Sequence, residues 1–234
     1  MTRTILVFIA SLALLGISTL SVTITPQIPI EVSDPALTKT QQVESMMKSQ
    51  FEANMQFGEV HSVLYIEDIA LDVVMKSQDN NDYYLDRNRE NQWHHEGELF
   101  FSQASNVKSP DDNLNMSVIY GHKMNNGNKF GKLKFLLGGG DATMYIYDGV
   151  ELKAYDLVRA FLYKDGSRSF EINDLRGEAR NEFLEDLSKD VLMSNYDNLG
   201  FTDEDIIFLQ TCVRSAGLDR HVFIFAEKEI NYEN

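Results

Sequence analysis

The chain has 234 residues, of which 43% are hydrophobic, so it is long enough to bury a sizeable core within one domain. Its formal net charge of −15 argues against nucleic acid as a partner, because a phosphate backbone requires a positive protein surface. The single cysteine excludes an intramolecular disulfide, and in an exported protein an odd cysteine indicates a reactive thiol.

The first expected element is an uncharged segment over residues 4–24, long enough as a helix to cross the roughly 30 Å hydrocarbon core of a membrane. Only Arg3 and the α-amino group precede it. We therefore expect residues 1–24 to be an uncleaved signal anchor in the cell membrane, with the rest of the chain extracellular. A cleaved secretory signal is the alternative. Residues 25–36 contain three of the four prolines and are predicted to be a stalk before a single domain over residues 37–234.

The domain is predicted to be mostly β with added helices. Val43, Met47, Phe51 and Met55 recur every four residues, which predicts an amphipathic helix over residues 37–55. Apolar residues recur in the same way over residues 175–191 behind cap candidates at 173 and 174, which predicts a second helix. Short β-branched and aromatic runs separated by Gly, Asn and Asp predict eight strands, as in a barrel or sandwich. These strands are residues 63–66, 69–75, 99–102, 116–120, 143–147, 150–163, 205–211 and 221–227.

Three residue types point to thiol chemistry. Cys212 ends an apolar run, Arg220 follows it, and His122 lies upstream in the triplet Tyr-Gly-His. A thiol is mostly protonated at neutral pH and needs a base or a positive neighbour, and histidine can provide both. A guanidinium supplies fixed donors for a negative oxygen. Arg214 competes for this task, but Arg220 is favoured because it directly precedes a predicted strand. A buried structural cysteine is the alternative interpretation of Cys212.

These residues and the segments around them resemble the sortases of class B, the cysteine transpeptidases of Gram-positive cell surfaces. Residues 115–124 and the following Phe-Gly-Lys-Leu of residues 130–133 are similar to the pattern in which a His-x-Met segment leads into Met/Phe-Phe-Gly-Lys-Leu. Residues 82–85 and the Gly-Glu-Leu-Phe of residues 97–100 resemble the Tyr-Tyr-Leu and Gly-Ser-Ile-Phe blocks of that class. The resemblance covers roughly residues 40–228.

The resemblance implies an eight-stranded sortase-type β-barrel with an N-terminal helix and a helix inserted before the strand that carries the cysteine. It implies a catalytic domain in which Cys212 is the nucleophile, His122 the acid and base, and Arg220 the oxyanion ligand. Residues that would contact or shape the bound peptide are Gln210, Thr211 and Val74.

The implied function is a transpeptidase that cleaves a C-terminal sorting motif of surface or pilin proteins. The acyl group would pass through a thioester on Cys212 to an amine, and a cell-wall cross-bridge and a pilin lysine both remain open as its source. A cysteine endopeptidase with the same residues and a non-catalytic anchored surface-binding protein are the alternatives.

The chain departs from the class B pattern at two places. Leu71-Asp72 precedes Val73-Val74-Met75 where class members usually have Tyr-Pro, and Gln210 stands where a small serine often precedes Thr-Cys. These departures bear on which peptide is recognised and leave the chemistry unchanged. We expect no cofactor and no metal, because the adjacent His94 and His95 lack a third ligand at metal-binding spacing.

Overall fold

The computed structural model describes residues 37–103, 116–164, 182, 184, 185, 191–195, 205–212 and 219–232. Its helical elements are α1 (Lys39–Asn54) and the short 3-10 helices η1 (Met55–Phe57), η2 (Tyr83–Leu85) and η4 (Leu133–Gly138). Its strands are β1 (Val60–Ile66), β2 (Ala70–Met75), β3 (Leu99–Phe101), β4 (Met116–Gly121), β5 (Thr143–Tyr147), β6 (Leu152–Lys164), β7 (Val191–Ser194), β8 (Ile206–Cys212) and β9 (Asp219–Lys228).

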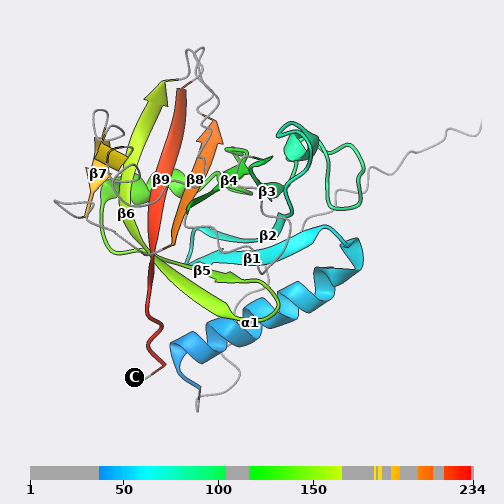
Figure 1. Cartoon of the computed structure of the whole chain (residues 1–234), viewed down its shortest axis with the longest axis horizontal. Helices are drawn as coiled ribbons and strands as arrows, with labels where there is room; N and C mark the ends of the chain where they lie inside the picture. Colours follow the sequence, from blue (N-terminus) through cyan, green and yellow to red (C-terminus); the bar gives the residue numbers. More distant parts are fainter. Residues whose placement is uncertain are drawn as a thin grey trace, which may run out of the picture. The chain divides into compact units, whose positions relative to one another are not determined.

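Eight of these strands close into a mixed barrel in the order β1-β2-β3-β4-β8-β9-β6-β5, with β5 pairing back onto β1 (Figure 1). The β2–β3 and β4–β8 pairs are parallel, and the other pairs of the circuit are antiparallel. The long strand β6 makes closure possible because it pairs with two strands. The first half of β6 pairs with β5, and β9 pairs with nearly the whole length of β6. β7 lies outside the circuit and pairs only with the second half of β6. The predicted mostly β, eight-stranded barrel with an N-terminal helix is confirmed.

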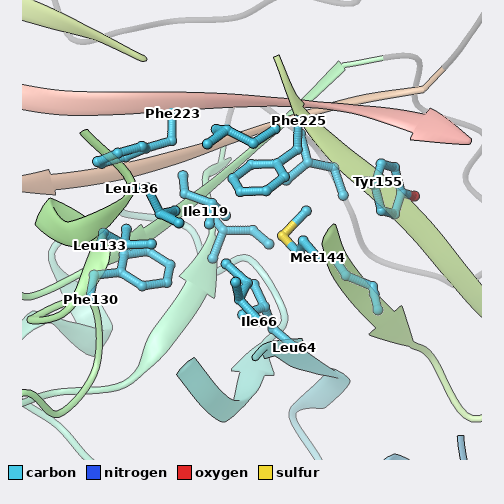
Figure 2. Packing of buried hydrophobic residues seen from close by; sticks show 14 of the residues in the cluster. Leu64, Ile66, Ile119, Phe130, Leu133, Leu136, Met144, Tyr155, Phe223 and Phe225 are labelled. Atoms are coloured by element: carbon cyan, nitrogen blue, oxygen red, sulfur yellow. The ribbon is translucent and has the colours of Figure 1, made fainter. Parts of the chain in front are cut away.

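An apolar core fills the barrel interior (Figure 2). Successive side chains of a strand point to opposite faces, so alternate residues such as Leu64 and Ile66 of β1 enter this core. Phe223 and Phe225 of β9 meet them from across the barrel. A second cluster lies on the opposite face of β1 and β2 and is covered by α1. A third, the outer cluster, lies on the outer face of β4, β6, β8 and β9.

The helix α1 begins behind a capping box at Thr38. The Thr38 side chain accepts a hydrogen bond from the Gln41 N–H at 3.2 Å, and the Gln41 side chain accepts one from the Thr38 N–H at 2.9 Å. Val43 and Met47 are buried as predicted, but Met55 is 60% exposed. The prediction for Met55 was wrong because α1 ends at Asn54. Met55 begins the 3-10 helix η1, in which the four-residue spacing no longer places it on the buried face of α1.

The predicted membrane anchor is corrected. No helix within the described ranges is both long and apolar enough to cross a membrane. The longest of them, α1, has 16 residues and spans about 24 Å, against a hydrocarbon core of roughly 30 Å. Residues 4–24 and 25–36, on which the prediction rested, lie outside the described residues. The single-pass extracellular localisation is therefore not retained, and the boundaries at 24 and 36 stay predictions.

The predicted strands are confirmed within a few residues, whereas the predicted helix over residues 175–191 lies mostly outside the described residues. Glu182, Leu184 and Glu185, which are described, are helical, and Leu184 is buried against the outer cluster of β6, β8 and β9. Val191 was wrongly placed in this helix, since it begins β7. The four-residue spacing carries no information about the pairing of Val191 with Phe161 of β6, which makes this residue part of a strand.

Candidate active site

The three predicted catalytic positions meet where β4, β8 and β9 lie side by side. β4 and β8 run parallel with Gly121 opposite Thr211, so His122 and Cys212 each follow the same rung of the ladder. β8 and β9 run antiparallel with Cys212 opposite Arg220. Neighbouring strands lie about 4.8 Å apart. The register therefore places these residues on three consecutive strands at one end of the barrel.

The outer apolar cluster lies on the same strands as these three positions. Phe208 of β8 and Val222 of β9 belong to the outer apolar cluster, and Tyr120 of β4 packs against it. Alternate positions of a strand share a face, so position 210 of β8 and position 220 of β9 lie on the outer face as well. Arg220 is half-buried there. Arg214, its rival, lies outside the described residues.

His122 is held through its ring. Its Nε2 lies 2.6 Å from the carbonyl oxygen of Leu85, at the end of η2. A carbonyl oxygen only accepts, so Nε2 carries the proton, and in the neutral ring Nδ1 is the basic nitrogen. The sequence analysis missed Leu85 because a backbone carbonyl leaves no signal in the residue type.

The loop after His122 is fixed at its tip by Glu96. The Glu96 carboxylate accepts from Asn126 Nδ2 at 2.7 Å and from Asn128 Nδ2 at 3.0 Å. Burial by itself would raise the pKa of Glu96, but these amide donors, together with His94 and His95, outweigh burial and hold the pKa below its usual range. The loop is closed at its base by the Phe130 N–H, which donates to the His122 carbonyl at 3.0 Å.

The residues predicted to bind substrate are all buried. Gln210 is 4% exposed and Thr211 2% exposed. Gln210 Oε1 and Thr211 Oγ1 have no hydrogen-bond partner within the described part of the chain. Val74 has no exposed surface and packs in the barrel interior. Its part in substrate binding stays a prediction. From the barrel interior Val74 could influence the site only through the strands that cover it.

The described residues contain no group of three or more His, Cys, Asp or Glu side chains that could hold a metal ion. His94 and His95 lie with their ring centroids 5.1 Å apart, on a loop near Glu96.

No protein-family model and no curated protein matches the chain. Solved structures of sortase B are similar to it in fold. The sortase B of Bacillus anthracis in complex with AAEK1 is 21% identical, with a TM-score of 0.64 over 77% of this chain and 85% of that chain. The Clostridium perfringens enzyme is 16% identical, with a TM-score of 0.65 over 76% and 99%. The Staphylococcus aureus sortase B-substrate complex is 15% identical, with a TM-score of 0.66 over 82% and 92%. The barrel thus has the sortase B fold.

Proposed function

We propose that the protein is a sortase-type cysteine transpeptidase. The observation that carries this proposal is the register of β4, β8 and β9, which aligns His122, Cys212 and Arg220 at one end of the barrel. A thiol, a base and a permanent cation on adjacent strands are the groups that acyl transfer through a thioester requires. The similarity of the barrel to sortase B supports the same chemistry.

In the first step the Cys212 thiolate attacks the carbonyl carbon of a peptide bond in a sorting motif. Arg220 stabilises the oxyanion, the C–N bond breaks, and the imidazolium of His122 gives its proton to the departing amine. The acyl group remains on Cys212 as a thioester. In the second step a primary amine attacks this thioester, His122 takes the amine's proton, and the C–S bond breaks to restore the thiolate.

A buried acceptor near Cys212 suits a peptide substrate. An unsatisfied buried oxygen costs free energy, and Gln210 Oε1 on the outer face of β8 is such an acceptor within the described residues. A bound peptide would provide an N–H or O–H donor for it. Thr211 alternates to the barrel interior, so its contribution would be to the strand beneath the peptide. We propose a surface or pilin protein as the donor of the acyl group, and a cell-wall cross-bridge or a pilin lysine as the amine.

The test is to incubate the full-length chain with threonine-containing sorting peptides and with candidate amines, and to identify products by mass spectrometry. We expect an acyl adduct on Cys212 and an amide product with the amine. Cys212→Ala and His122→Ala should abolish both and leave thermal stability close to wild type. A free acid as the sole product would replace the transpeptidase by an endopeptidase. Absence of any adduct with an unreactive Cys212 thiol would favour a binding protein and overturn the proposal.

Two arginine variants test which residue stabilises the oxyanion. Arg220→Lys keeps the charge but loses the planar fork, so we expect turnover to fall about 100-fold. Arg214→Lys is the comparison and should change turnover by less than about threefold. A larger loss for Arg214→Lys than for Arg220→Lys would transfer the role to Arg214.

A further inference from the structure

A buried ionic cluster lies beside the segment that follows β4. Lys129 Nζ is 2.5 Å from Glu98 Oε2 and 2.8 Å from Asp72 Oδ2. Arg89 Nε is 3.0 Å from Glu98 Oε1, and Arg89 also donates to Asn54 Oδ1 at 2.5 Å and to Asp72 Oδ1 at 3.3 Å. Only 8% of the Lys129 side chain and 4% of the Glu98 side chain are exposed. The cluster joins α1, β2, the loop before β3 and the loop after His122.

The charges in this cluster balance. Burial by itself would lower the pKa of Lys129, but the carboxylates of Asp72 and Glu98 outweigh burial and raise it. Burial would likewise raise the pKa of Glu98, but Lys129 and Arg89 hold it below its usual range. Lys129 and Glu98 are therefore ionised near neutral pH, and the cluster pairs two basic side chains, Lys129 and Arg89, with two acidic ones, Glu98 and Asp72. Removing one partner would leave an uncompensated buried charge, so the geometry of the cluster is strongly constrained.

The Lys129–Glu98 pair connects the two segments between which the His122 ring is held. On one side, Lys129 precedes Phe130, whose N–H donates to the His122 carbonyl at 3.0 Å, and Lys129 itself forms a β-bridge with Lys123. On the other side, the Glu98 N–H donates to the Tyr84 carbonyl at 3.0 Å, next to Leu85. The ion pair thus fixes the distance between His122 and the Leu85 oxygen that accepts its Nε2–H.

We propose that Lys129 is a positioning residue for His122. By pairing with Glu98 and Asp72, Lys129 keeps the His122 ring against the Leu85 carbonyl, so that Nε2 retains its proton and Nδ1 exchanges protons with the substrate. Three members of the cluster, Asp72, Glu98 and Lys129, stand at positions where the class B pattern described above has Pro, Ser and Met/Phe. The device is therefore a feature of this chain that the general pattern does not contain.

The proposal builds on the proposed role of His122, but its first readout requires no turnover. In wild-type protein labelled with ¹⁵N-histidine, we expect the ring nitrogens of neutral His122 to show a single Nε2–H tautomer. Its signals are assigned by their loss in His122→Gln. In Lys129→Met we expect a mixture of the two tautomers, because the ring is no longer held against Leu85. Lys132→Met is the matched control on the same loop, since the Lys132 side chain donates only to the carbonyl of the exposed Asp68, at 3.4 Å, among the described hydrogen bonds.

With the peptide and amine of the transpeptidation assay, Lys129→Met should lower kcat about tenfold and change KM by less than about twofold. Lys129→Arg, which retains the charge, should recover part of kcat. If Lys129→Met does not fold, Asp72→Asn removes one partner of Lys129 at constant shape and should show the same tautomer mixture to a smaller extent.

A single Nε2–H tautomer in Lys129→Met and in Asp72→Asn would overturn the positioning role, whatever the loss of thermal stability. Turnover by the wild type with unchanged kcat in both variants would overturn it as well. A tautomer mixture in the variants, together with a wild type that forms no Cys212 adduct, would support the positioning role and sink the proposed function. The two failures are therefore distinguishable.

Discussion

At the scale of single residues, glycine is required where the loop after His122 folds back on itself. A Cβ on Gly131 would collide with the Met124 carbonyl oxygen and would lie 2.9 Å from the Cα of Gly127. Both atoms belong to the backbone and cannot move away as a flexible side chain could. Gly138, at the end of η4, has no atom within 4 Å of its Cβ position.

Gly131→Ala should therefore lower the free energy of unfolding by about 1–3 kcal/mol, the usual cost of forcing an extra methyl group into a packed site. Gly138→Ala is the matched control and should leave the free energy of unfolding within about 0.5 kcal/mol. Urea denaturation followed by circular dichroism measures both. Equal stabilities for the two variants would mean that the loop does not pack as described.

At the scale of elements, α1 is held by its apolar face and begins at a capping box. Val43 and Met47 are buried against the barrel, and Met46 and Phe51 pack beside them. The reciprocal hydrogen bonds between Thr38 and Gln41 give an acceptor to the backbone N–H of each residue, and neither N–H has a partner within the helix.

Thr38→Ala should lower the free energy of unfolding by about 1 kcal/mol, since the Gln41 N–H loses its acceptor. Ser49→Ala, at an exposed position inside the same helix, should be neutral or slightly stabilising because alanine has the higher helix propensity. Thermal and urea unfolding compare the two variants. A neutral Thr38→Ala would show that packing alone fixes where α1 begins.

At the scale of the whole molecule, two buried carboxylates couple the fold to pH. The donors and cations around Glu96 and Glu98 outweigh their burial and hold the pKa values of both carboxyl groups below their usual range. A depressed folded-state pKa means that folding favours the carboxylate, so its contribution to stability is fully present above the unfolded pKa. That contribution is lost as the pH falls through the folded pKa. Stability should therefore decrease below about pH 4.5.

Glu96→Gln isolates one of these two groups. The amide cannot be protonated in this range, so the free energy of unfolding of Glu96→Gln should fall less steeply than that of the wild type as the pH decreases from about 6 to about 3. Asp141→Asn is the control for a general charge effect, because Asp141 is exposed and lies outside the loop after His122. Identical slopes for the wild type and Glu96→Gln would contradict the role given to Glu96.

Much of the fold was predictable because local patterns and tertiary packing agree. The predicted strands contain β-branched and aromatic residues whose apolar members enter one of three cores, as Leu64, Phe208 and Val63 do. β7 escaped prediction because Val191 and Leu192 are 38% and 44% exposed, and only the pairing of Val191, Met193 and Ser194 with β6 makes the segment a strand. A local pattern carries no information about such an edge.

The site divides in the same way. By itself the sequence determined that a lone cysteine, a histidine and an arginine were candidates for thiol chemistry and that the chain forms a β-rich domain, because residue type and periodicity are local properties. Only the tertiary structure decided that His122, Cys212 and Arg220 follow matching rungs of three adjacent strands, that β5 closes the barrel on β6, and that Lys129 pairs with Glu98. These relations join residues far apart in the chain, and strand register and burial, which fix them, exist only once the chain has folded.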